Sequence, residues 1–159
     1  MIILGIDPGA SGALAFANFE KGLLDIVDMP CVQVKRMKTV KREISPAMLA
    51  AIINARRPDV AFIEKVGAMP GNGGSSMFQF GRGVGMIEGV LAALEIPTHY
   101  ITPAKWQRGV QQREGKDGGR ERASQLFPAY ATMFLRVKDD GRSDAALIAY
   151  YGFTNGESK

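Results

Sequence analysis

The sequence is poor in the residues that form disulfides, soft metal sites and catalytic triads. It contains one cysteine, Cys31, and one histidine, His99. A single cysteine excludes an intrachain disulfide and a cysteine-rich zinc site, and it suits a reducing compartment. A lone histidine inside an expected strand favours a structural role, and no serine–histidine–aspartate triad can be assembled around it.

Long apolar runs are also missing. No run reaches the ~20 residues of a membrane span, and the first residues lack a basic region followed by a long apolar one. We therefore expect no membrane partner and a cytoplasmic location. Hydrophobic residues make up 46% of the chain and charged residues 23%, as in folded domains. We expect one folded domain over residues 1–153 and a flexible tail over residues 154–159.

Positive charge exceeds negative charge by a small margin. The chain has 20 Lys and Arg against 16 Asp and Glu, a net charge of +4 that suits a polyanionic partner. Five basic residues crowd one segment: Lys35, Arg36, Lys38, Lys41 and Arg42. This segment is either a contact surface for that partner or a solvated basic loop, and both interpretations stay open.

Apolar runs, caps and turn residues predict the order of the secondary structure. We expect strands over residues 2–6, 13–18, 23–29, 60–63 and 97–101. We expect helices from Ser45 to about Arg57, from Ser75 or Ser76 to about Glu95, from Thr102, over 119–127, and from Gly141 onward. Three antiparallel strands followed by two that are reached through helical crossovers give an α/β fold, a five-stranded mixed sheet flanked by helices.

The second expected helix carries glycine at every fourth residue, at Gly81, Gly85 and Gly89. Each glycine costs about 1 kcal/mol relative to alanine inside a helix, so the stripe predicts a close approach to the sheet or to another helix. We expect Phe78 and Phe80, which lie on this helix, to pack in the protein core. The same segment does not follow a strand, which argues against a nucleotide-binding loop and a nucleotide cofactor.

Four carboxylates form a candidate catalytic and metal-binding set. Asp7 and Glu64 each end an apolar strand, and Asp140 and Asp144 are four residues apart, on one face of a helix. Clustered carboxylates repel one another, and two divalent cations relieve that repulsion. Oxygen ligands favour Mg²⁺ or Mn²⁺, and two such ions activate water for attack on a phosphodiester.

Three motifs resemble the acidic motifs of the RuvC family. They are Gly5-Ile6-Asp7-Pro8-Gly9, Phe62-Ile63-Glu64 and Ser143-Asp144-Ala145, and the segments 75–81 and 102–106 are similar to those of small phage-type members. The resemblance spans nearly the whole chain. It implies an RNase H-like fold, a homodimer, and paired nicking of four-way (Holliday) junctions that leaves 5′-phosphate and 3′-hydroxyl ends. It also implies a bacterial or phage-infected host cell.

The chain departs from the family at the fourth acidic position. The bacterial pattern places an acid three residues before the last aspartate, where this chain has Gly141. Asp140 is the substitute that we expect, and Asp139 is its rival. A second departure follows Glu64, where bacterial members carry an aromatic wedge and this chain does not. Met69, Phe78 or Phe80 would have to replace it.

Four basic residues are candidates for DNA binding. Lys105, Lys116 and Arg120 lie where members of the family place basic residues near the scissile phosphate, and Arg122 is close by in sequence. Phosphate contacts of this kind give affinity without sequence specificity, and the binding weakens with salt. Trp106, beside Lys105, is expected to pack in the core.

Other classes of protein share parts of this sequence pattern with a junction-resolving nuclease. Sugar kinases and actin-like ATPases share the superfold, but they need two such domains to enclose ATP, and this chain offers one. A noncatalytic protein that binds branched DNA would keep its affinity without divalent ions and would never cut. Within the nucleases, a broader enzyme would also cut forks and flaps.

Overall fold

The computed structural model describes residues 1–36, 39–67 and 73–156, and its centre is a five-stranded sheet in the order β3-β2-β1-β6-β7. The strands are β1 Ile3–Asp7, β2 Ala13–Asn18, β3 Leu23–Asp28, β6 Val60–Glu64 and β7 Thr98–Ile101. The first three are antiparallel, and β6 and β7 run parallel to β1. The predicted mixed sheet is therefore confirmed.

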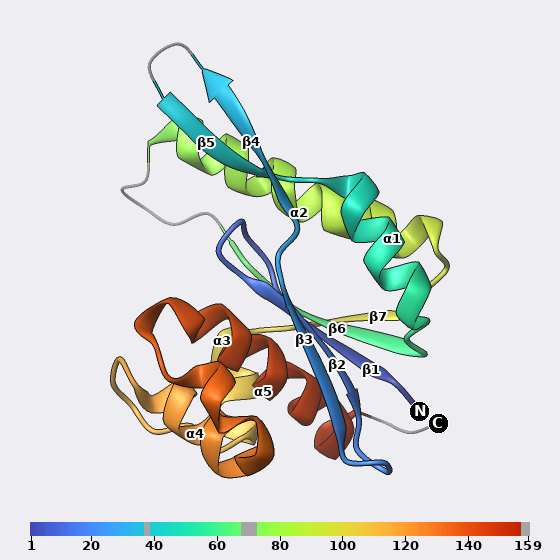
Figure 1. The fold of residues 1–159 in the computed structure, drawn as a ribbon, viewed down its shortest axis with the longest axis vertical. Helices are drawn as coiled ribbons and strands as arrows, with labels where there is room; N and C mark the ends of the chain where they lie inside the picture. The colour runs from blue at the N-terminus through green and yellow to red at the C-terminus, as the bar shows by residue number, and fades with distance from the viewer. Residues whose placement is uncertain (37–38, 68–72, 157–159) are drawn as a thin grey trace.

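Helices cover both faces of this sheet (Figure 1). The helices α1 Pro46–Arg56 and α2 Gly74–Ala93 lie on one side. The other side carries α3 Pro103–Gly109, α4 Gly118–Leu126, α5 Asp140–Asn155 and the 3-10 helices η1 Pro128–Phe134 and η2 Val137–Asp139. Side chains of a strand alternate between the two faces of a sheet. In β1, Leu4 and Ile6 therefore pack against the layer of α1 and α2, and Ile3 packs against the layer of α5.

Helix α5 lies directly on β1, and Gly5 makes this possible. A methyl group added at Gly5 would lie 2.1 Å from the carbonyl oxygen of Ala145 and 2.5 Å from the backbone nitrogen of Ala149. No larger residue fits at this point without moving the helix. The close approach brings the first turns of α5 beside the end of β1.

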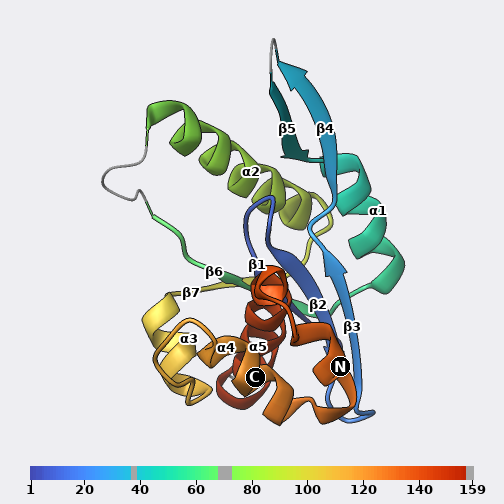
Figure 2. The same cartoon turned by 60° about the vertical axis from the view of Figure 1, so that its left-hand side comes forward.

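A second, two-stranded sheet was not predicted. The strands β4 Cys31–Arg36 and β5 Thr39–Ile44 form an antiparallel hairpin. It extends away from the central sheet, on the side of α2 (Figures 1 and 2). The basic segment is thus a strand pair rather than a loop, and the alternation of Val32, Val34 and polar residues was a signal for it.

Helix α2 differs from its predicted packing. Methyl groups added at Gly81, Gly85 and Gly89 would meet no atom within 4 Å, so the expected close approach is not made within the described chain. Phe78 is 71% exposed, and its assignment to the core is wrong. Phe80 is half-buried. The helix turns this glycine face and Phe78 outward, because its buried contacts come from Ile87 and Leu91.

The structure also bears on His99, on the C-terminal tail and on the expected absence of a membrane span. His99 stacks on Phe62 with ring centroids 4.9 Å apart, a structural contact. Helix α5 continues to Asn155, two residues into the expected tail. Met69, a candidate wedge, lies outside the described residues. Within those residues no helix has both the length and the apolar character to cross a membrane.

Candidate active site

The ends of two neighbouring strands place the first two carboxylates. Strands β1 and β6 are parallel, and Ile6 lies opposite Ile63 in their register. The next residue on each strand is Asp7 or Glu64, so both carboxylates lie at the same edge of the sheet. Parallel strands always bring their carboxyl ends to one edge, which is why this juxtaposition could be expected from the sequence.

Helix α5 supplies the third carboxylate, Asp144. It directly precedes Ala145, the residue that touches β1 at Gly5. The charges of Asp144 and Glu64 both raise the pKa of Asp7, so the three groups lie within electrostatic range of one another. The structure therefore brings together Asp7, Glu64 and Asp144.

Burial and mutual repulsion change the protonation of this cluster. Burial, then the charges of Asp144 and Glu64, raise the pKa of Asp7 to about 8. Burial, then the charges of Glu64 and Asp140, raise the pKa of Asp144 to about 7. Near neutral pH the metal-free cluster thus holds protons, which a divalent cation would displace.

Trp106 holds Glu64, a contact that the sequence analysis missed. The indole of Trp106 is fully buried, and its Nε1 donates a hydrogen bond to Glu64 Oε2 over 2.7 Å. Burial raises the pKa of Glu64, and this hydrogen bond opposes that shift. The expected packing role is confirmed, but the side chain also orients a candidate ligand.

The structure separates Asp139 from Asp140. Asp139 is 1% exposed and forms ion pairs with Arg136 and Arg142, and hydrogen bonds from Arg136 lower its pKa to about 2. Asp140 is exposed, and its charge raises the pKa of Asp144. Asp139 is therefore already paired with two arginines, and Asp140 is the acid that lies within electrostatic range of Asp144.

The family's fourth acidic position has no room for a side chain here. A methyl group added at Gly141 would lie 2.6 Å from the carbonyl oxygen of Ser11 and 3.0 Å from Asp7 Oδ2. Only glycine allows α5 to begin this close to the turn after β1. This packing gives a physical reason for the departure at Gly141.

The four candidate DNA-binding residues fall into two groups. Lys105 on α3 and Lys116 before α4 are exposed. Arg120 forms ion pairs with Asp117 and with Asp140, where Nε lies 2.8 Å from Oδ1. The Nε of Arg122 donates to the carbonyl oxygen of Val110 over 2.6 Å. The two lysines are open to DNA, whereas both arginines are already engaged in the protein.

The donor set has the chemistry of a site for a hard divalent cation, and two of its carboxylates already have protein partners. Among residues 1–36, 39–67 and 73–156, no three Asp, Glu, His or Cys side chains are arranged to hold one ion. Glu64 faces Trp106, and Asp140 faces Arg120. The donors are all carboxylate oxygens, which Mg²⁺ and Mn²⁺ prefer.

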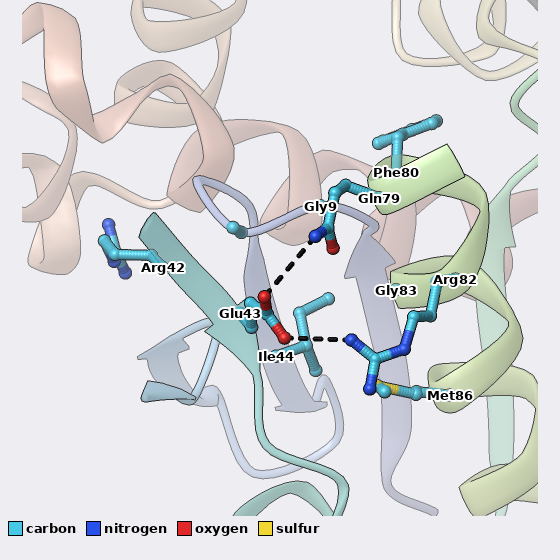
Figure 3. A pocket seen from close by; sticks show the side chains of 10 residues that line it. Gly9, Arg42, Glu43, Ile44, Gln79, Phe80, Arg82, Gly83 and Met86 are labelled. Atoms are coloured by element: carbon cyan, nitrogen blue, oxygen red, sulfur yellow. Dashed lines mark hydrogen bonds and ion pairs between the residues drawn. The ribbon is translucent and has the colours of Figure 1, made fainter. Parts of the chain in front are cut away.

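A pocket of about 210 Å³ adjoins this edge between β5 and α2 (Figure 3). Its wall includes Gly9 and Ala10, from the turn that follows Asp7. Glu43 crosses it, accepting hydrogen bonds from Gln79 over 3.4 Å and from Arg82 over 2.9 Å. These contacts attach the base of the hairpin to α2.

The sheet order and the helix that carries Asp144 define an RNase H-like fold. No known family model matches the chain, and no curated protein matches its sequence. Solved structures do match. Thermus thermophilus RuvC in complex with a Holliday junction substrate is 12% identical, with a TM-score of 0.67, over 98% of this chain and 96% of that chain. A second Thermus thermophilus RuvC structure is 14% identical, with a TM-score of 0.60, over 98% and 97%.

A more distant match comes from yeast. The yeast mitochondrial Holliday junction resolvase Ydc2 is 16% identical, with a TM-score of 0.52, over 94% of this chain and 77% of that chain. The structural neighbours are thus RuvC and other Holliday junction resolvases, and the chain has their fold. This was the resemblance that the acidic motifs indicated.

Proposed function

We propose that this protein is a divalent-metal-dependent DNA endonuclease that resolves four-way junctions by paired nicks, carried by one nuclease domain. The observation that carries the proposal is the meeting of Asp7, Glu64 and Asp144 at one edge of a RuvC-type fold. A metal-free cluster with raised pKa values is poised to exchange protons for cations. The single cysteine suits the cytoplasm of a bacterial or phage-infected cell.

The proposed chemistry is phosphodiester hydrolysis. Asp7, Glu64 and Asp144 would hold two Mg²⁺ or Mn²⁺ ions, with Asp140 as the fourth ligand. When bound, such ions activate water and stabilise the leaving oxygen, which gives 5′-phosphate and 3′-hydroxyl ends. The hydrogen bond from Trp106 would fix the position of the Glu64 carboxylate.

The candidate DNA contacts divide by their present partners. Lys105 and Lys116 would contact backbone phosphates directly. Arg120 would contact DNA only after leaving Asp140, and Arg122 only after leaving the carbonyl oxygen of Val110. We therefore expect the two lysines to contribute more to DNA binding than the two arginines.

Paired nicking requires two active sites, and we propose a homodimer. The outward face of α2 offers a surface that a second copy could approach closely, because Gly81, Gly85 and Gly89 meet no atom there within the described chain. Glycine in a helix interior lowers stability. Close contact with a second copy of the chain would explain why three glycines lie on this exposed face.

The test compares four labelled substrates: an immobile four-way junction, a fork, a flap and a linear duplex. Each is incubated at matched concentration with and without Mg²⁺ or Mn²⁺. Metal-dependent paired nicks confined to the four-way junction support the proposal. Equal cutting of forks and flaps would favour the broader debranching nuclease. Binding of branched DNA with no cutting in either metal would overturn nuclease activity and leave a binding protein.

A further inference from the structure

The net positive charge of the chain resides in the β4–β5 hairpin. Residues 31–44 hold five of the 20 Lys and Arg but one of the 16 Asp and Glu, which leaves 15 residues of each sign in the rest of the chain. The one acid, Glu43, is itself paired with Arg82 of α2. The remainder of the molecule has no excess of charge with which to attract a polyanion.

The hairpin contributes little to the core. It forms its own two-stranded sheet, and two of its three valines, Val32 and Val40, are 44% and 62% exposed. Ile44, at the base, is buried. A two-stranded hairpin is only marginally stable by itself. Its six-residue strands are therefore not explained by what they add to the packing of the domain.

The base of the hairpin touches the turn that follows Asp7. Cys31 Sγ lies 3.6 Å from the carbonyl oxygen of Ala10. Arg42 lines the same pocket as Gly9 and Ala10, and its side chain points away from α2 (Figure 3). Each strand spans about 20 Å at ~3.3 Å per residue. The hairpin thus leads outward from the edge that holds the carboxylates.

Strand pairing puts the basic side chains on defined faces. Arg42 lies opposite Gln33, and Lys35, two residues further along β4, shares their face. Lys41 lies opposite Val34, on the other face. Arg42, Lys35 and Lys41 are all exposed. The face with Arg42 and Lys35 is a short basic track that begins beside the candidate active site.

We propose that the β4–β5 hairpin is an arm that binds the phosphate backbone of DNA, with Arg42 and Lys35 contacting the strand that runs outward from the cut site. The inference rests on the proposed function only in taking DNA as the partner, and it does not require cutting. Lys41, on the second face, would contact DNA only if the strand wraps the hairpin. The competing explanation is that lysines on exposed strands merely prevent edge-to-edge pairing between copies.

The experiment measures binding of a fluorescent four-way junction by anisotropy in EDTA, over a series of salt concentrations. The hairpin variant is Lys35→Gln with Arg42→Gln. Its control, Lys21→Gln with Arg57→Gln, removes two exposed basic residues from the opposite edge of the sheet. Lys35→Gln with Lys41→Gln repeats the charge change without altering Arg42, which contacts Cys31. Thermal unfolding verifies that each variant is folded.

The association constant K of a DNA-binding protein falls with salt, and losing two phosphate contacts should make the slope of log K against log salt concentration less negative by about 2. Binding should weaken at least ~10-fold at 0.1 M salt. The control should bind as wild type does. Loss confined to the variant with Arg42 would place the contact on that face. If both hairpin variants bind with the affinity and salt slope of wild type, the hairpin does not contact DNA and this proposal is wrong. Nuclease activity is tested separately, by the cleavage assay. If wild type binds no DNA, both proposals fail.

Discussion

Two aspartates of this protein have pKa values moved in opposite directions, and their neighbours account for the difference. Asp7 lies among other carboxylates, and its pKa is raised to about 8. Asp139 lies between Arg136 and Arg142, and its pKa is lowered to about 2. The residue with a raised pKa is the one that gains from a bound cation.

The raised pKa of Asp7 predicts that the metal-free protein loses stability as pH rises. The group contributes stability below its ordinary value of 3.8, and this contribution is lost as pH rises through about 8. In EDTA the melting temperature should fall between pH 5 and pH 8.5. Asp7→Asn should raise stability at pH 8.5 by ~1–3 kcal/mol. Mg²⁺ should stabilise wild type more at pH 8.5 than at pH 5, and a pH-independent melting temperature would contradict this account.

Trp106→Phe should separate the orienting role of the indole from its packing role. The ring volume is largely kept, but Glu64 Oε2 loses its hydrogen-bond donor. We expect ~10–100-fold weaker Mn²⁺ affinity or activity, because such partners orient metal ligands. Isothermal titration with Mn²⁺ and single-turnover cleavage measure the two effects. A variant that loses stability but binds Mn²⁺ as wild type does would reduce Trp106 to packing.

At the scale of the element, the start of α5 is fixed by contact rather than by helix propensity. Gly141→Asp, which places an acid at the family's position, should lower activity rather than raise it. The side chain would push against Ser11 and Asp7, with an expected cost of ~1–3 kcal/mol. Thr154→Ala, at the exposed end of the same helix, should change stability by less than ~0.5 kcal/mol. Chemical denaturation compares the two, and a fully active Gly141→Asp variant would contradict the packing argument.

The elements also show what the sequence can and cannot predict. Strand ends at Asp7 and Glu64 were predictable, because an apolar run followed by an acid marks both the strand and its edge. The hairpin was missed because its lysines obscured a valine alternation. The pairing of Arg120 with Asp140 and of Arg122 with the carbonyl oxygen of Val110 could not be read from sequence, since it depends on how α4 meets α5 and the loop after α3. Asp139 is paired with arginines three residues away on either side, whereas Asp140 is paired with Arg120 of another helix.

At the scale of the whole molecule, paired cutting depends on association of two copies. Light scattering should give twice the chain mass of 17.2 kDa. Gly85→Arg, on the outward face of α2, should shift this mass toward the monomer, because a long charged side chain blocks close approach. The variant should then nick junctions without coordinating the two cuts. A monomeric wild type that still makes paired nicks would contradict the proposed dimer.

The molecule as a whole combines a neutral body that carries the carboxylates with a basic hairpin that leads away from them. We propose above all that these carboxylates hydrolyse DNA with the help of divalent metal ions. The most direct measurement is single-turnover nicking of a four-way junction in Mg²⁺ by wild type and by Asp7→Asn, with binding measured in parallel. We expect Asp7→Asn to slow nicking on the order of 10³-fold and to leave binding largely intact. Nicking at the wild-type rate by Asp7→Asn would contradict it.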